Sequence, residues 1–216
     1  MKVITVANQK GGAGKTTTVF HLAVQAEADG AGPVAMIDFD PQGSLSVPYK
    51  QREAETPVMA RSDMAELPKK LKQLEEAGFK LVLIDTPPTD TPQLKRALEA
   101  SDLVLIPMQA SPLDLAAVGP TLVSIKELGR PFLFFMNRVN PRTLLCSQAI
   151  ARLSKHGPVA DTVIEGRTEY ASALNDGRTM QEVNPRGKGA REIASLWAEV
   201  SGMISPTKKK KEKRVA

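Results

Sequence analysis

The chain carries a glycine-rich loop directly after a short apolar strand, close to its N-terminus. Residues 8–17 read NQKGGAGKTT and follow the β-branched run at residues 2–7, and apolar residues at helical spacing then predict a helix from Thr16 to Asp29. A strand, a glycine loop and a helix together present backbone N–H groups and the positive end of a helix to a phosphate. Lys15 adds an ammonium group and Thr16 a hydroxyl group for Mg²⁺, so the stretch predicts a nucleoside triphosphate site.

The loop departs from the general phosphate-loop pattern. That pattern, G-x-x-x-x-G-K-S/T, would place a glycine at position 9, where this chain has Gln9, and Lys10 precedes the glycines instead. The sequence KGGAGKTT resembles the deviant Walker A box of the ParA/MinD family of ATPases. The resemblance implies that Lys15 binds phosphate within its own subunit, whereas Lys10 crosses to the partner's nucleotide in a homodimer that sandwiches ATP. The alternative for Lys10 is an ordinary solvated loop lysine. The implied nucleotide-binding residues of the loop are Lys10, Gly11, Gly12, Ala13, Gly14, Lys15, Thr16 and Thr17.

Two acidic motifs follow apolar runs that predict buried strands. The first, DFDPQ at residues 38–42, resembles the family's switch I segment. By that match Asp40 positions or activates the attacking water, so the implied catalytic residues are Lys10, Lys15 and Asp40. Asp38 helps to hold the water shell of Mg²⁺. A capped turn is the alternative, because Asp-Pro is a common turn pair. The second run, residues 79–85, ends in Asp85 and has the Walker B form. That form implies that Asp85 is an outer-shell partner of Mg²⁺ beside Thr16. The next residues, TPPT at 86–89, resemble the family's switch II segment.

Two further positions are candidates for contact with the base of the nucleotide. Asn137 follows the predicted strand 132–136, and in related phosphate-loop folds an asparagine at this place hydrogen-bonds the base, here adenine. A capping role for Asn137 is the alternative. The loop 182–185, which ends in Pro185, lies where relatives contact the base from the far side.

The remaining chain alternates between apolar strand patterns and helical patterns. Helices are predicted at residues 63–77, 112–128, 143–155 and 189–204, strands at residues 102–107 and 159–164, and a variable connection with a short helix at residues 45–60. This order predicts an α/β fold with a doubly wound, mainly parallel sheet flanked by helices. We expect one ATPase domain over residues 1–204 and a basic, disordered tail over residues 205–216.

The net charge of +5 comes from the end of the chain. Residues 208–214 hold six basic residues and one acidic residue, which leaves 23 Lys and Arg against 23 Asp and Glu in the rest of the chain. Nucleic-acid affinity would therefore come from a local patch or from this tail. The candidates for DNA binding are Arg167, Arg186, Lys188 and Arg191, with an ordinary solvated basic face as the alternative, and the tail is either an auxiliary contact or a solubilising end.

Several classes of protein are disfavoured by what the sequence lacks. The chain has no apolar run of the length that a membrane span requires, and its N-terminus runs straight into a strand, which leaves no room for a signal peptide. The single cysteine, Cys146, cannot form an internal disulfide or a shared iron–sulfur site. The last helix resembles a core helix and not an amphipathic membrane anchor. These features favour a cytoplasmic protein without stable membrane insertion, and the family resemblance implies that it associates with the nucleoid.

The resemblance implies a small ParA-type ATPase, similar to the ParF-type plasmid partition proteins. Its implied cofactors are ATP and Mg²⁺, and its implied partners are a second copy of the chain, non-specific DNA and a centromere-binding protein of the ParB/ParG kind that stimulates hydrolysis. Whether the active form polymerises is left open. A positioning ATPase for a protein cargo, such as a carboxysome or a chemoreceptor cluster, is the alternative, and a MinD-like regulator whose Lys-rich tail meets anionic lipid is a third.

Overall fold

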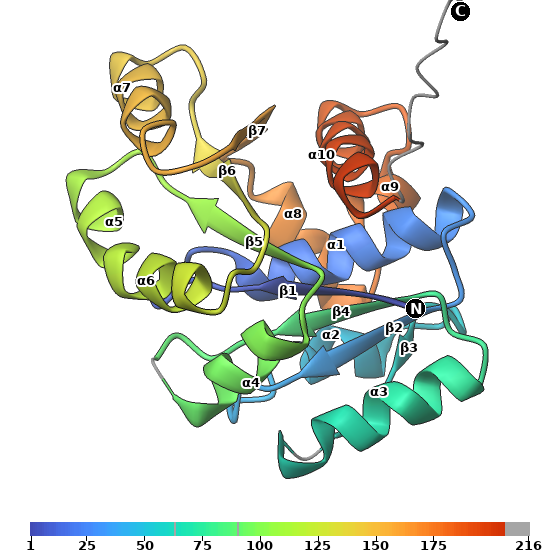
Figure 1. The fold of residues 1–216 in the computed structure, drawn as a ribbon. Helices are drawn as coiled ribbons and strands as arrows, with labels where there is room; N and C mark the ends of the chain where they lie inside the picture. Colours follow the sequence, from blue (N-terminus) through green and yellow to red (C-terminus); the bar gives the residue numbers. More distant parts are fainter. Residues whose placement is uncertain (63, 90, 206–216) are drawn as a thin grey trace, which may run out of the picture.

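A parallel sheet forms the centre of the computed structural model, which describes residues 1–62, 64–89 and 91–205 (Figure 1). Within these residues seven strands lie in the order β3-β2-β4-β1-β5-β6-β7, and every neighbouring pair is parallel. The doubly wound parallel sheet expected from the sequence is therefore confirmed. The strands are β1 (Lys2–Val6), β2 (Val34–Asp38), β3 (Val58–Met59), β4 (Leu81–Asp85), β5 (Leu103–Met108), β6 (Phe132–Val139) and β7 (Val159–Glu165).

The central strands are almost entirely apolar because both faces of the sheet are covered. Every residue of β4 and β5 is buried, as are four of the five residues of β1. Strands that bury both faces read as continuous apolar runs and not as alternating ones. This burial makes the acidic residue at the end of β4, Asp85, exceptional among its neighbours.

Helices cover both faces of the sheet (Figure 1). One face carries α1 (Lys15–Ala28), α2 (Ser46–Gln51), α8 (Glu169–Ser172), η2 (Ala173–Asp176), α9 (Met180–Val183) and α10 (Lys188–Ile204). The other face carries η1 (Met64–Glu66), α3 (Leu67–Glu76), α4 (Pro92–Ala100), α5 (Pro112–Ala117), α6 (Gly119–Glu127) and α7 (Leu144–Leu153). None of the helices in the described ranges has both the length and the apolar composition needed to cross a bilayer.

The helix α1, which follows the glycine loop, is fixed to the C-terminal part of the chain. Trp197 of α10 is buried, and its indole N–H donates to the carboxylate of Asp29 at 3.0 Å, which confirms Trp197 as a core residue. His21 of α1 is fully buried and packs edge-on against the ring of Tyr170 in α8, with centroids 5.3 Å apart. Segments from the two ends of the chain therefore pack against each other beside the site described below.

Three local predictions differ from the structure. The single helix expected over residues 112–128 is two helices, because α5 ends at Ala117 and α6 begins at Gly119, with Pro120 in its first turn. Proline lacks the N–H group that a continuous helix would use there. The connection predicted at residues 45–60 contains the short edge strand β3, and β6 continues past Met136, so Asn137 lies inside a strand. The predicted tail, apart from Ser205, lies outside the described residues.

Candidate nucleotide site

The glycine loop lies at the carboxyl end of β1, in the middle of the sheet. β1 is flanked by β4 and β5, so the crevice where ligands bind in sheets of this kind opens at the loop. Gly12 and Gly14 have positive φ values of +73° and +89°, which glycine adopts without strain. At Gly14 there is also no space, because a Cβ atom would overlap with the amide of Asn137.

Side chains from β6 and from the end of β5 hold the carbonyl groups of the loop. The amide nitrogen of Asn137 donates to the carbonyl of Ala13 at 2.7 Å. Arg138 and Gln109 donate to the carbonyl of Gly12 at 3.2 Å and 3.4 Å. These contacts turn carbonyl oxygens toward the neighbouring strands and away from the crevice, as an anion site made of backbone N–H groups requires.

The two lysines of the loop lie in different surroundings. Lys15 is buried at the start of α1, and its ammonium group lies 3.5 Å from the carbonyl oxygen of Lys10. Burial lowers the pKa of Lys15, while the nearby charges of Asp85 and Asp40 oppose that shift. Lys10 instead extends to α5, where its ammonium group lies 2.6 Å from the carboxylate of Asp114. The structure thus separates the roles that the two lysines can take.

A carboxylate and a hydroxyl group meet beside the loop in a way that suits a hydrated cation. The hydroxyl of Thr16 donates to Oδ2 of Asp85 at 2.6 Å, and the other oxygen, Oδ1, is buried with no hydrogen-bond partner among the described residues. Burial raises the pKa of Asp85 to about 7, with the Thr16 hydroxyl opposing the shift and the charge of Asp38 adding to it. Oxygen ligands of this kind fit the water shell of Mg²⁺.

Asp38 lies next to Asp85, because the register of β2 and β4 pairs these two residues. Both oxygens of Asp38 accept backbone N–H groups, from Asp40 at 2.9 Å and from Leu45 at 3.0 Å. Asp40 accepts the N–H of Gln42 at 3.0 Å. The capped-turn interpretation is therefore correct for both aspartates, and their roles toward Mg²⁺ and water stay predictions.

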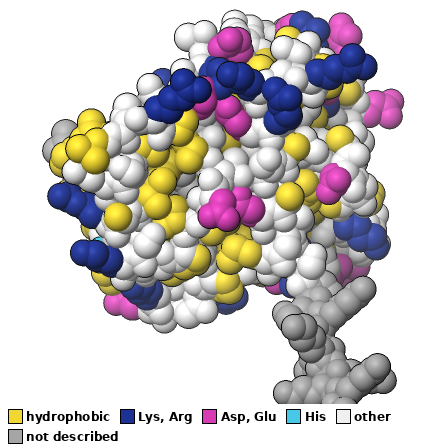
Figure 2. All heavy atoms as spheres, turned by 90° about the horizontal axis from the view of Figure 1, so that it is seen from above, with side chains coloured by type: hydrophobic (Ala, Val, Ile, Leu, Met, Phe, Trp, Pro, Cys, Tyr) yellow, Lys and Arg dark blue, Asp and Glu magenta, His cyan; other side chains and the backbone are white. Residues whose placement is uncertain are grey.

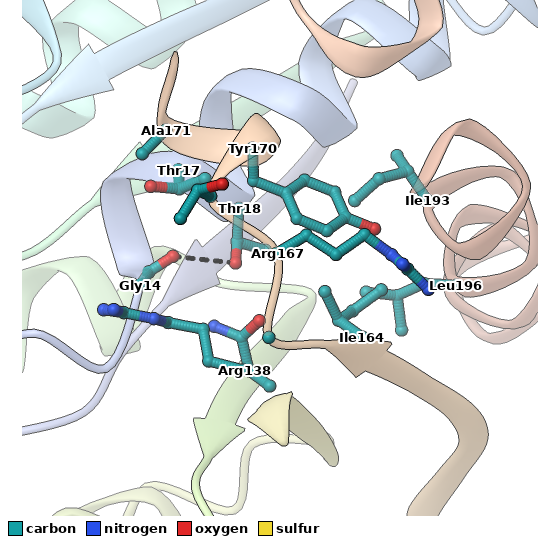
Figure 3. Close-up of a pocket in the computed structure, with 13 residues that line it drawn as sticks. Gly14, Thr17, Thr18, Arg138, Ile164, Arg167, Tyr170, Ala171, Ile193 and Leu196 are labelled. Carbon is teal, nitrogen blue, oxygen red and sulfur yellow. Dashed lines mark hydrogen bonds between the residues drawn. The ribbon is translucent and has the colours of Figure 1, made fainter. Parts of the chain in front are cut away.

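A cavity of about 350 Å³ lies beside the loop on the α10 side (Figure 3). Tyr170, Ile164, Ile193 and Leu196 form its apolar wall, and Gly14 and the first turn of α1 lie opposite them. A largely apolar pocket with a few polar groups is the usual setting for a cofactor. The full lining is Gly14, Thr17, Thr18, Asn137, Arg138, Ile164, Gly166, Arg167, Thr168, Tyr170, Ala171, Ile193 and Leu196.

The structure places the two base-contact candidates differently. Asn137 lines the cavity, but its amide nitrogen is engaged by the loop carbonyl of Ala13. Pro185 does not line the cavity and is exposed. Arg138, which sequence reasoning missed, also lines the cavity and has a φ of +57°, in the region that non-glycine residues rarely occupy. Nothing in the sequence around Arg138 signals this conformation, and the register of β6 against β7 shifts at this residue.

The four basic candidates for DNA binding fall into two groups. Arg167 is held by two carboxylates, Glu165 and Glu192, the latter at 3.0 Å, so it is not a free surface cation. Arg186, Lys188 and Arg191 are exposed around the start of α10, and within the described part of the chain none of them forms an ion pair. On the face seen in Figure 2, Lys and Arg side chains gather along one edge with Asp and Glu side chains between them.

Comparisons with known proteins agree with this geometry. The family model of the CobQ/CobB/MinD/ParA nucleotide binding domain matches residues 4–180. The chain is 30% identical over 239 aligned residues to the chromosome-partitioning ATPase Soj of Thermus thermophilus, covering 93% of this chain and 96% of that protein. It is 32% identical over 207 residues to the maintenance of carboxysome distribution protein A of Gloeobacter kilaueensis, covering 93% and 92%. The septum site-determining protein MinD of Pyrococcus horikoshii, complexed with Mg-ADP, has the same fold, with a TM-score of 0.74 at 19% identity, covering 94% and 98%.

Proposed function

This chain belongs to the CobQ/CobB/MinD/ParA nucleotide-binding family, and on that premise we propose that it is an ATP hydrolase that dimerises on ATP, binds non-specific DNA and segregates plasmid or chromosomal DNA. A centromere-binding partner of the ParB/ParG kind stimulates the hydrolysis. The observation that carries the proposal is the division of the two loop lysines. Lys15 lies against its own loop, and Lys10 points away from it toward α5.

The residues around the loop divide the chemistry of hydrolysis between them. Lys15 neutralises the terminal phosphates, which the backbone of residues 11–17 holds by its N–H groups. Thr16, Asp38 and Asp85 hold Mg²⁺ and its waters, and the ion supplies positive charge to the phosphate oxygens. Asp40, at the start of the turn held by Asp38, orients the attacking water. Lys10 completes the site of a second subunit.

The cavity beside the loop is the proposed place for adenine. Its apolar wall of Tyr170, Ile193 and Leu196 suits a flat, largely apolar base. Asn137 keeps its predicted place near the base but acts through the loop, because its amide holds the Ala13 carbonyl. Arg138 joins the proposed nucleotide contacts, and Pro185 is a less favourable candidate since it lies outside the cavity.

DNA binding is assigned to the exposed cations around the start of α10. Arg186, Lys188 and Arg191 carry this part of the proposal, and Arg167 is left out because Glu165 and Glu192 neutralise it. Contacts of this kind are made to phosphates, so binding weakens steeply with salt, with a log–log slope of about −0.9 for each phosphate neutralised.

The test is the affinity of the ATP-bound protein for DNA of unrelated sequences. Arg186→Ala with Lys188→Ala is expected to weaken binding to all of them equally and to reduce the salt slope by about 2. Arg178→Ala is the matched control, because Arg178 is exposed but paired with Asp176 at 2.5 Å. Unchanged affinity in the double variant would remove DNA binding from this surface.

A second candidate function is the positioning of a protein cargo. It is favoured by the 32% identity to a carboxysome distribution protein. The alignment with that protein covers 93% of this chain, as does the alignment with Soj. Both candidates use the same nucleotide chemistry and the same DNA surface. Deletion of the gene separates them, because loss of a plasmid or of chromosome segregation follows from the first and misplacement of a protein assembly with normal DNA inheritance follows from the second.

A further inference from the structure

The backbone of Lys10 is fixed at both of its polar groups, and its side chain is the part that can move. The N–H of Lys10 donates to the side chain of Asn8 at 2.9 Å. Its carbonyl oxygen lies 3.5 Å from the ammonium group of Lys15. The side chain of Lys10 is 32% exposed, so its ammonium group can leave its present place through a change of rotamers alone.

The partner of that ammonium group is a carboxylate with no access to solvent. None of the Asp114 side chain is exposed, and its Oδ1 atom lies 2.6 Å from the Lys10 nitrogen as an ion pair without hydrogen-bond alignment. The other oxygen accepts the hydroxyl of Ser111, which in turn caps α5 by accepting the N–H of Asp114 at 3.2 Å. Lys10 is therefore the one cation paired with this buried charge among the described residues.

The end of β5 and the segment that leads from it to α5 are joined to the loop at two further places. The amide of Asn8 donates to the carbonyl of Pro107 at 2.7 Å, and Gln109 donates to the carbonyl of Gly12 at 3.4 Å. Asp114 is thus held at a fixed place relative to Lys10. Asp114 therefore loses little side-chain entropy when the pair forms, and only the Lys10 side chain is ordered by it, in contrast to an exposed ion pair.

We propose that Asp114 retains Lys10 within its own subunit, and that it thereby sets the protein concentration at which ATP-bound chains dimerise. The inference rests on the proposed function, in which Lys10 reaches the nucleotide of a second copy. Removing the cation from a buried carboxylate is penalised, so the exchange requires a stronger anion than Asp114. A triphosphate is such an anion, and a diphosphate, with less negative charge, competes less well.

The direct test is Asp114→Asn, which keeps the shape and the acceptor for Ser111 but removes the charge. Its dimer with ATP is expected to form at a concentration about 10-fold lower than that of the wild-type dimer, measured by sedimentation equilibrium. A dimer with ADP is expected to become detectable as well. Asp114→Glu, which keeps the charge, is expected to restore the wild-type preference for ATP. Asp114→Ser gives the same test if the asparagine variant does not fold.

The matched control is Asp102→Asn, which removes a Lys–Asp pair at the opposite end of the sheet, where Lys2 lies 2.9 Å from Asp102. That variant is expected to dimerise as the wild type does. A double-mutant cycle of Lys10→Ala and Asp114→Asn, measured on the unfolding of the nucleotide-free protein, is expected to show coupling between the two residues.

The two proposals fail in different ways. If the wild-type chain does not dimerise on ATP, the proposed function is wrong. If the wild type dimerises on ATP but Asp114→Asn dimerises equally well or more weakly, Asp114 does not retain Lys10 and the inference is overturned. An absence of coupling in the double-mutant cycle would overturn it as well.

Discussion

Gly14 and Asn137 approach each other so closely that no side chain can stand between them. The amide of Asn137 reaches past Gly14 to the carbonyl of Ala13 at 2.7 Å, and a Cβ atom on Gly14 would occupy the place of that amide. A residue of β6 thereby fixes the shape of a loop that follows β1. The shape of the proposed phosphate site depends on this contact.

Gly14→Ala is expected to distort the loop, because it adds an overlap to a φ of +89°. We expect a loss of about 1–3 kcal/mol in the free energy of unfolding and a weakening of ATP binding of at least about 10-fold. Calorimetric titration with ATP and urea unfolding measure the two effects. Gly11→Ala is the control, since a Cβ atom there meets nothing within 4 Å. Equal ATP affinities in the two variants would contradict this account of the loop.

Asp85→Asn is expected to remove the Mg²⁺ dependence of nucleotide binding. Asp85 is the buried carboxylate that accepts the Thr16 hydroxyl, and its other oxygen has no hydrogen-bond partner in the part of the chain that the structure describes. The amide can still accept that hydroxyl, but it brings no negative charge to a hydrated cation. Titrations with ADP in the presence of Mg²⁺ or of a chelator measure the dependence. A variant that still gains affinity from Mg²⁺ as the wild type does would exclude Asp85 from the metal site.

His21 predicts a loss of stability in mild acid. Burial lowers the pKa of His21 from 6.5 to about 4 in the folded chain, with the hydrogen bond to the Thr17 carbonyl opposing the shift. Between these two pH values the unfolded chain binds a proton at His21 more readily than the folded chain does. The contribution of His21 to the free energy of unfolding is therefore complete above pH 6.5 and decreases as the pH drops toward 4. The resulting loss in the free energy of unfolding amounts to about 3 kcal/mol.

Urea unfolding at several pH values measures this loss. His21→Gln is expected to flatten the dependence between pH 6.5 and 4, although it lowers stability overall. His156, the second of the two histidines in the chain, is exposed, and His156→Gln is the matched control for the loss of an imidazole. A His21→Gln profile as steep as that of the wild type would assign the loss to other groups.

Features that are local in sequence could be predicted. The strand–loop–helix unit, the acidic residue at the end of β4 and the cap at Ser111 each depend on a few adjacent residues, and the family membership inferred from the order of these motifs is confirmed. The break at Gly119-Pro120 is equally local, and the prediction of one helix over residues 112–128 missed it.

Features that depend on distant residues could not be predicted. Asp114 lies far along the chain from Lys10, and no pattern in either segment indicates their ion pair. Arg167 resembles a free cation in the sequence, because Glu192 meets it only through the packing of β7 against α10. The left-handed conformation of Arg138 coincides with a shift in the register of β6 against β7, which the sequence does not indicate.

The central claim, that the two loop lysines serve different subunits, is tested most directly by comparing Lys15→Ala with Lys10→Ala. Loss of the Lys15 ammonium group is expected to reduce ATP affinity by about 100-fold or more, because the terminal phosphates lose a charged donor. Lys10→Ala is expected to bind ATP as the wild-type monomer does and to remain monomeric with saturating ATP in sedimentation experiments. ATP-dependent dimers of Lys10→Ala at the wild-type yield would contradict the account.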